Sequence, residues 1–139
     1  MAAIEVSGLT KRYGDVVANE DLTFDVREGE IFGYLGPNGA GKTTTIRMLV
    51  TLLRPTSGTA RIAGQPIEDR PAVTERIGFL PESPPLFEEL TGREQLEYAA
   101  GLRDIPGAEA EARIEELLDR FDLAADADRR ISAYSKGMK

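Results

Sequence analysis

The sequence contains no cysteine and no histidine among its 139 residues. Without cysteine, the chain has no disulfide, no thiolate ligand for a metal and no cysteine nucleophile. Without histidine, it lacks the commonest general base and the commonest zinc ligand. Long apolar runs are also missing. The longest stretches, such as residues 48–53, are far too short to cross a bilayer.

The charge balance is acidic, with a formal net charge of −7. A general nucleic-acid-binding protein needs a basic face, so we expect no nucleic-acid partner. The N-terminus has no charged segment followed by an apolar one, and therefore no secretory signal is expected. Because 41% of the residues are hydrophobic, the chain can build the core of about one domain, and a cytoplasmic location is the default expectation.

The first half of the chain is typical of strands and turns. Apolar residues alternate with polar ones around Ile4 and again over residues 22–26, which predicts half-buried strands. The apolar run 31–35 predicts a strand that enters a glycine-rich loop, and the apolar spacing over residues 46–53 predicts a helix that ends at Pro55. Three shorter elements are expected after it, namely a strand at 59–63, a helix at 72–76 and a strand at 77–80.

The second half of the chain is typical of helices. Thr91 and Glu94 have the spacing of a capping box, in which each side chain bonds the other residue's backbone amide. A second helical stripe runs over residues 110–121, after a break at 101–107. We therefore expect one α/β domain with two parts, an antiparallel and loop-containing core over residues 1–87 and a helical subdomain over 88–139.

Residues 36–43 fit the pattern G-x-x-x-x-G-K-[ST], which is typical of a phosphate-binding loop. Glycines at 36, 39 and 41 allow left-handed turns, so that successive amides point at one anion. We expect Lys42 to act as the catalytic residue between the β- and γ-phosphates and the Thr43 hydroxyl to bind Mg²⁺. The predicted nucleotide-binding residues of this loop are Gly36, Pro37, Asn38, Gly39, Ala40, Gly41, Lys42, Thr43 and Thr44.

The loop reads GPNGAGKTT and resembles that of the ATP-binding cassette (ABC) proteins, which have a P-loop NTPase core. Tyr13 stands where that family has an aromatic residue that stacks on adenine. The segment from Ile77 to Glu82 resembles the one that ends in the family's Q-loop, with glutamate in place of the usual glutamine. The stretch AYSKGM resembles a variant of the family's signature, in which Ser135 and Gly137 match the serine and the second glycine.

The sequences of the segments LTGREQLE and YSKGMK are most similar to those of the drug- and antibiotic-exporter branch of the family. This resemblance implies an ATP-binding subunit that couples ATP binding and hydrolysis to export through a transmembrane permease subunit. It further implies ATP and Mg²⁺ as cofactors, with Thr43 and Glu82 near the metal. A second copy or a second ABC subunit would complete each site, with Ser135 and Gly137 acting in trans. The expected location is cytoplasmic, peripheral at the inner face of the cell membrane.

Three parts of the family pattern are missing from the sequence, namely the Walker B aspartate, the catalytic glutamate and the switch histidine. The sequence stops at Lys139, directly after the signature. We therefore expect this chain alone to bind nucleotide weakly and to hydrolyse it negligibly. The strand before the loop would also lack its neighbours, which predicts an unstable or aggregation-prone product.

Three alternatives remain open from the sequence. A soluble ABC-type ATPase of DNA repair or translation is one, although the span from Lys42 to Ser135 is too short for the coiled coil of repair proteins. Another phosphate-loop enzyme is the second, since residues 104–107 match the GTPase pattern D-x-x-G, but they follow a helical stripe instead of a strand. A non-hydrolysing truncated remnant that sequesters complete cassettes is the third.

Overall fold

The structure is a computed structural model that describes residues 2–37, 39 and 41–139. Asn38 and Ala40, two of the predicted nucleotide-binding residues, lie outside the described residues. The chain divides into two compact units, which we call the first unit (residues 1–79) and the second unit (residues 80–139). The boundary expected at residue 87, between an ATP-binding core and a helical subdomain, stays a prediction.

The first unit is built on one antiparallel sheet with the strand order β2-β1-β3-β4. The long strands β1 (Ala2–Tyr13) and β2 (Val16–Arg27) form a hairpin, and β3 (Ser57–Ile62) and β4 (Gln65–Pro66) complete the sheet. The predicted strands around Ile4, over 22–26 and at 59–63 are thereby confirmed.

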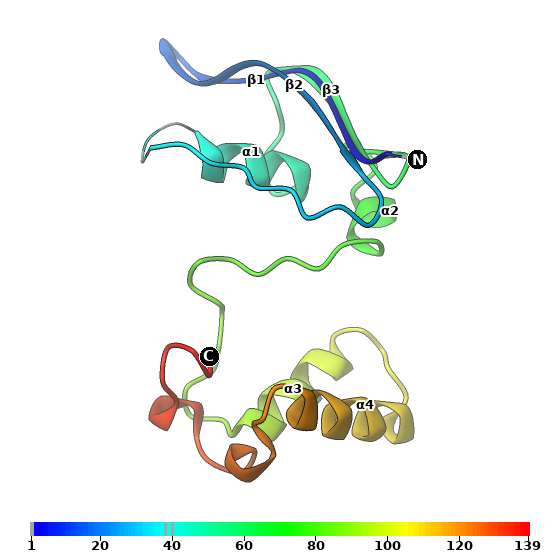
Figure 1. Cartoon of the computed structure of the whole chain (residues 1–139), viewed down its shortest axis with the longest axis vertical. Coiled ribbons are helices and arrows are strands. Elements are labelled where there is room, and N and C mark those ends of the chain that lie inside the picture. The colour runs from blue at the N-terminus through cyan, green and yellow to red at the C-terminus, as the bar shows by residue number, and fades with distance from the viewer. Residues whose placement is uncertain (1, 38, 40) are drawn as a thin grey trace. The chain divides into compact units, whose positions relative to one another are not determined.

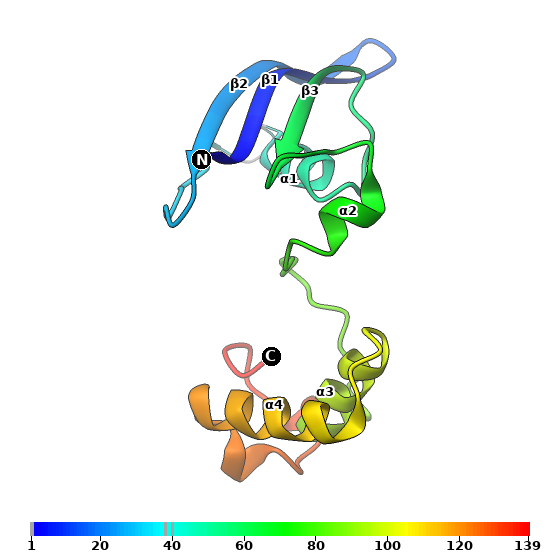
Figure 2. The same cartoon turned by 90° about the vertical axis from the view of Figure 1, so that its right-hand side faces the viewer.

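Two helices pack on the same face of this sheet, α1 (Lys42–Leu49) and α2 (Arg70–Thr74), as Figures 1 and 2 show. The core between the sheet and the helices consists of buried apolar side chains, namely Val6, Leu9, Met48, Ala60, Ile62, Ile67 and Val73. Because Met48 comes from the single helix that follows the glycine-rich loop, this core fixes α1, and hence the end of the loop, against the sheet.

A bulge in the hairpin changes which side chains of β2 face the core. Leu9 pairs with Leu22, whereas Lys11 pairs with Asn19, so β2 uses one residue more than β1 over this stretch. Asp21 lies within it and has a left-handed φ of 48°. An extra residue in one strand moves the following side chains to the opposite face. Asn19 is therefore buried on the core side, although simple alternation from Leu22 would point it to solvent.

The predicted strands at 31–35 and 77–80 are wrong, because no strand among the described residues pairs with either segment. Alternate residues of the first segment nevertheless face the sheet, since Phe32 and Tyr34 both stack on Phe24. The intervening Ile31 and Leu35 are 101% and 91% exposed. The apolar pattern thus reports an extended segment correctly, but an extended segment becomes a strand only with a hydrogen-bonded neighbour.

The helix predicted over residues 46–53 ends four residues early, at Leu49. Thr51 adopts a left-handed φ of 64°, and the amides of Leu52 and Leu53 both bond back to the carbonyl of Arg47. Such a left-handed residue after the last turn satisfies the terminal carbonyls and stops the helix. The proline at position 55 is therefore not the residue that ends α1.

The second unit is helical, as predicted, with α3 (Gly92–Gly101), α4 (Gly107–Arg120) and two short 3₁₀ turns, η1 (Ala124–Asp126) and η2 (Ile131–Ala133). The predicted capping box is confirmed, with the Glu94 amide 3.2 Å from the Thr91 hydroxyl and the Thr91 amide 2.8 Å from the Glu94 carboxylate. A small apolar core joins the two helices to η1, and its residues are Ile114, Leu118, Ala127, Leu96 and Leu123. None of the helices in the described part of the chain is long and apolar enough to span a bilayer.

Candidate nucleotide-binding site

The predicted phosphate-binding loop lies between the extended segment 30–35 and α1. Gly39 and Gly41 adopt left-handed φ angles of 84° and 80°, as predicted. The left-handed turn expected at Gly36 stays a prediction. The two left-handed glycines turn the backbone directly before the helix, which is where an anion-binding loop needs its amides to converge.

The start of α1 carries no side-chain cap. Its N-cap residue is Gly41, and neither a capping side chain nor an acidic residue in the first turn is present among the described residues. The amides of the first turn therefore have no competing side-chain acceptor there, and the positive end of the helix dipole is available to an anion.

The Lys42 side chain reaches back across the loop, where its ammonium donates a hydrogen bond to the carbonyl of Gly36. The loop is thereby closed into a ring between its first and last residues. The ammonium adds a full positive charge to the partial charges of the amides, so this ring is suited to a polyanion such as a triphosphate. Thr43 is exposed in the first turn of α1, one residue beyond this lysine.

The end of the loop is fastened to β2. The Asn19 amide nitrogen lies 3.0 Å from the Gly41 carbonyl and 2.7 Å from the Thr45 hydroxyl, and the Tyr34 hydroxyl lies 3.3 Å from that same threonine oxygen. A side chain at position 41 would not fit, since an added Cβ would lie 2.3 Å from the Ala18 carbonyl oxygen. Sequence reasoning missed these supporting residues, because a polar residue in a strand and a threonine in a helix carry no distinctive pattern.

Tyr13 lies at the end of β1 and is 51% exposed, with the Lys11 ammonium 5.0 Å from the centre of its ring. Lys11 pairs across the hairpin with Asn19, the residue that touches the loop. The tyrosine therefore extends two residues beyond the point where the hairpin meets the loop. A half-exposed aromatic ring has the flat surface that stacking on a base requires, and the stacking role of Tyr13 stays a prediction.

The two predicted metal ligands belong to different units of the chain. Thr43 is in the first unit and Glu82 is in the second, and both are exposed. Among the described residues, no group of three or more Asp, Glu, His or Cys side chains is placed to hold a metal. The Thr43 hydroxyl has the oxygen chemistry that Mg²⁺ prefers, and a threonine plus phosphate oxygens is a usual arrangement for this ion. The role of Glu82 stays a prediction.

The signature segment lies in the second unit. Ser135 and Gly137 are exposed, and the amides of Met138 and Lys139 both bond to the Ser135 carbonyl, at 3.1 and 3.2 Å. These two bonds close a single turn that begins at Ser135. The Lys139 ammonium also pairs with Glu88 at 2.5 Å, which ties this turn to the segment before α3.

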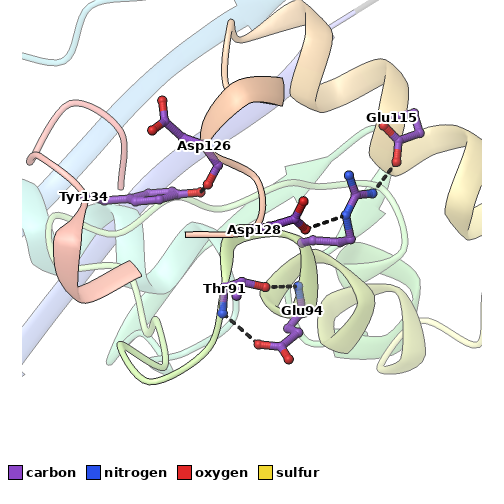
Figure 3. A network of polar contacts seen from close by, with 7 residues as sticks. Thr91, Glu94, Glu115, Asp126, Asp128 and Tyr134 are labelled. Carbon is purple, nitrogen blue, oxygen red and sulfur yellow. Dashed lines mark hydrogen bonds and ion pairs between the residues drawn. The ribbon is translucent and has the colours of Figure 1, made fainter. Parts of the chain in front are cut away.

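Tyr134, directly before the signature serine, anchors the segment. Its ring is buried, and its hydroxyl donates to the Asp126 carbonyl at 2.6 Å (Figure 3). Burial raises the pKa of this phenol above the usual value of 10.0. The folded state therefore disfavours ionisation of this phenol. The associated stability is present below the pKa of the unfolded chain and is lost as the pH rises through the raised pKa of the folded chain.

Ion pairs of Arg93, at the start of α3, hold α3 against α4. Arg93 pairs with Glu115 on α4 and, at 3.1 Å, with Asp128 after η1 (Figure 3). Hydrogen bonds to these two carboxylates raise the pKa of the guanidinium, which stays charged. Gly92, next to this arginine, leaves room for Tyr134, since an added Cβ there would lie 2.3 Å from the phenol oxygen.

A sequence profile described as "ABC transporter" matches residues 19–139, which is most of the chain. The chain belongs to the ABC transporter family. The resemblance seen in the loop and signature motifs is thereby confirmed. The GTPase alternative fails. Residues 104–106 lie between α3 and α4, and Gly107 is the first residue of α4.

Two curated relatives of this ABC chain are export or resistance proteins. Daunorubicin resistance ATP-binding protein DrrA3 of Streptomyces coeruleorubidus is 46% identical over 99% of this chain and 44% of its own length. Nod factor export ATP-binding protein I of Paraburkholderia xenovorans is 42% identical over 99% of this chain and 46% of its own length. The chain thus spans less than half the length of these two relatives.

Solved structures of ABC proteins share the fold. A structure described as the ATP-binding subunit of an ABC transporter has a TM-score of 0.83 and 37% identity, covering 98% of this chain and 57% of its own. CbiO1 of Clostridium perfringens, described as part of the ABC transporter complex cbiONQ, has a TM-score of 0.85 at 24% identity. It covers 96% of this chain and 56% of its own and supports the fold alone. The predicted fold class, a P-loop NTPase core with a helical subdomain, is confirmed.

The close approach of Gly92 and Tyr134 gives a testable prediction on the second unit. Gly92→Ala is expected to lower the free energy of unfolding, because the methyl group meets the phenol oxygen. Tyr134→Phe alone should cost about 1–2 kcal/mol, since it leaves the Asp126 carbonyl unpaired. The double variant should be more stable than Gly92→Ala alone, as measured by urea unfolding followed by circular dichroism.

The matched control is Gly101→Ala, in the same helix, where an added Cβ meets nothing within 4 Å. That variant is expected to be neutral or slightly stabilising. A double variant no more stable than Gly92→Ala would show that the phenol does not occupy the space above Gly92.

Proposed function

We propose that this chain is the nucleotide-binding part of the ATP-binding subunit of an ABC exporter, which couples ATP binding and hydrolysis to export through a permease. The observation that carries the proposal is the loop before α1. There, left-handed Gly39 and Gly41 direct the backbone and the Lys42 ammonium closes the loop onto Gly36. Backbone amides beside one ammonium have the charge and the hydrogen-bond donors that a nucleotide's terminal phosphates require.

Each predicted residue has a distinct role in this proposal. Lys42 binds the β- and γ-phosphates and stabilises the charge that shifts between them during hydrolysis. The Thr43 hydroxyl holds Mg²⁺, which neutralises phosphate charge when it is bound. Tyr13 stacks on the adenine ring from the end of β1.

A second nucleotide-binding subunit completes the site in this proposal. Ser135 and Gly137 are exposed on a single turn that Tyr134 fixes to the second unit, so another subunit's nucleotide can reach them. They would contact the γ-phosphate from across the interface. Hydrolysis by the 139 residues alone is expected to be negligible, since the family's later catalytic residues are not among them.

The relatives favour export over a soluble ABC function, because they are named a daunorubicin resistance and a Nod factor export ATP-binding protein. An exporter of this type works through a transmembrane permease subunit. We therefore place the protein at the cytoplasmic face of the membrane, bound to that subunit.

Lys42→Ala tests the proposed nucleotide site. We expect affinity for MgATP to fall about ten- to hundredfold, since a charge-assisted hydrogen bond is worth about 1.5–3 kcal/mol. The measurement is titration of purified protein with MgATP, followed calorimetrically. Arg47→Ala, which removes a positive charge from the same helix, is the control and should bind as the wild type does. Equal affinity of the Lys42 variant and the wild type would contradict the proposal.

The permease contact is proposed at residues 82–91, the segment that precedes α3. Phe87 is 48% exposed, its ring packs edge-on against Tyr98 at 5.2 Å, and its amide donates to the Gln95 side chain at 2.9 Å. The aromatic pair is thus both fixed to α3 and available to a partner. Exposed aromatic side chains held in one geometry are typical anchors of protein interfaces.

Phe87→Ala is expected to weaken capture of the co-expressed cognate permease subunit about tenfold or more, as the loss of an aromatic anchor does. The measurement is a pull-down from detergent-solubilised membranes. Phe121→Ala is the matched control, because Phe121 is a 66% exposed aromatic residue after α4 and outside the segment. Capture that is unchanged by Phe87→Ala, or reduced equally by Phe121→Ala, would place the contact elsewhere.

A further inference from the structure

Asn19 is a buried polar residue whose contacts belong to the phosphate loop. It lies on β2, is 5% exposed, and faces the core because of the bulge at Asp21. Its amide nitrogen donates to the Gly41 carbonyl at 3.0 Å and to the Thr45 hydroxyl at 2.7 Å. A strand residue far from the motif in sequence is therefore in direct contact with the residue that joins the loop to α1.

The orientation of this amide follows from the chemistry of its partners. The Gly41 carbonyl only accepts hydrogen bonds, so the nitrogen of the Asn19 side chain must face it. The Thr45 hydroxyl donates to that carbonyl at 3.1 Å, which leaves its lone pairs for the second proton of the Asn19 amide. The carbonyl also accepts the Thr45 backbone amide at 2.9 Å, so donors from β2 and α1 converge on a single oxygen.

The direction of the Gly41 carbonyl decides the direction of the next amide. In a planar trans peptide, the carbonyl and the following N–H point in opposite directions. Holding the Gly41 carbonyl toward Asn19 therefore turns the Lys42 N–H away from β2. The Lys42 N–H is the first amide of α1, and it has no acceptor within the helix.

The amide oxygen of the Asn19 side chain helps to identify the role of this residue. Its Oδ1 atom is buried and has no hydrogen-bond partner among the residues that the structure describes. A buried acceptor without a donor is unfavourable, and an apolar side chain of the same shape would avoid that cost. The two donor contacts to the loop and α1 are the compensating interaction.

We propose that Asn19 is a positioning residue for nucleotide binding, whose side-chain amide holds the Gly41–Lys42 peptide so that the Lys42 N–H faces the phosphates. The inference rests on the proposed function, since it assigns how that same site is pre-organised. According to this inference, the hairpin that carries Tyr13 also fixes the orientation of the peptide at the end of the phosphate loop.

The test compares Asn19→Leu and Asn19→Met, two variants whose apolar side chains cannot donate to the Gly41 carbonyl. Affinity for MgATP should fall about tenfold in both, as expected for the loss of one buried hydrogen-bonded group. Amide hydrogen exchange at Lys42 and Thr43 should become faster in the protein without nucleotide. Thr23→Val is the matched control, because Thr23 lies on β2 like Asn19 and its hydroxyl accepts a hydrogen bond from the Gly8 amide on β1. This variant should change neither readout.

The outcomes separate this inference from the proposed function. Should the Asn19 variants fail to fold, Thr45→Val removes the hydroxyl of the same network and should give the same two effects. Wild-type affinity together with wild-type exchange at Lys42 in the folded variants would overturn the role of Asn19. If even the wild type binds no MgATP, the proposed function fails, and the exchange at Lys42 still shows whether Asn19 holds the loop.

Discussion

The hydrogen bonds that converge on the Gly41 carbonyl are the interaction on which the candidate site depends. They come from the Asn19 amide and from the hydroxyl and backbone amide of Thr45. They join the sheet, the loop and α1 at one atom, so the amides of the first helical turn have a fixed direction before any anion arrives. In the proposed site, a fixed direction of these amides lowers the conformational cost of binding an anion at the start of α1, which is how pre-organisation raises affinity.

The signature segment is held by the same kind of local constraint. Tyr134 is buried beside Gly92, and its hydroxyl bonds the Asp126 carbonyl, so the exposed turn at Ser135 starts from a fixed point. The backbone of residues 130–132 also pairs with residues 88–91, through the Ile131 and Ser132 amides. The segment proposed to meet the permease and the segment proposed to meet the second nucleotide are thereby parts of one hydrogen-bonded unit.

The sequence predicted the features whose chemistry is local. The capping box at Thr91, the left-handed glycines at 39 and 41 and the hairpin strands follow from short-range spacing. It failed where a distant partner decides the outcome. Residues 31–35 have strand-like spacing but no strand beside them, and Asn19 faces the core only because of the bulge across the hairpin. The support of the loop could not be predicted for the same reason, since contacts across 22 residues leave no periodic signal.

Phosphate binding by this loop is tested most directly by the response of individual backbone amides to MgATP, followed by heteronuclear NMR. We expect the largest shifts at Gly39 and at residues 41–44, with a smaller effect at Tyr13, and we expect Lys42→Ala to remove them. Saturable binding of MgATP that leaves the amides of residues 41–44 unshifted would contradict the claim that this loop binds the phosphates.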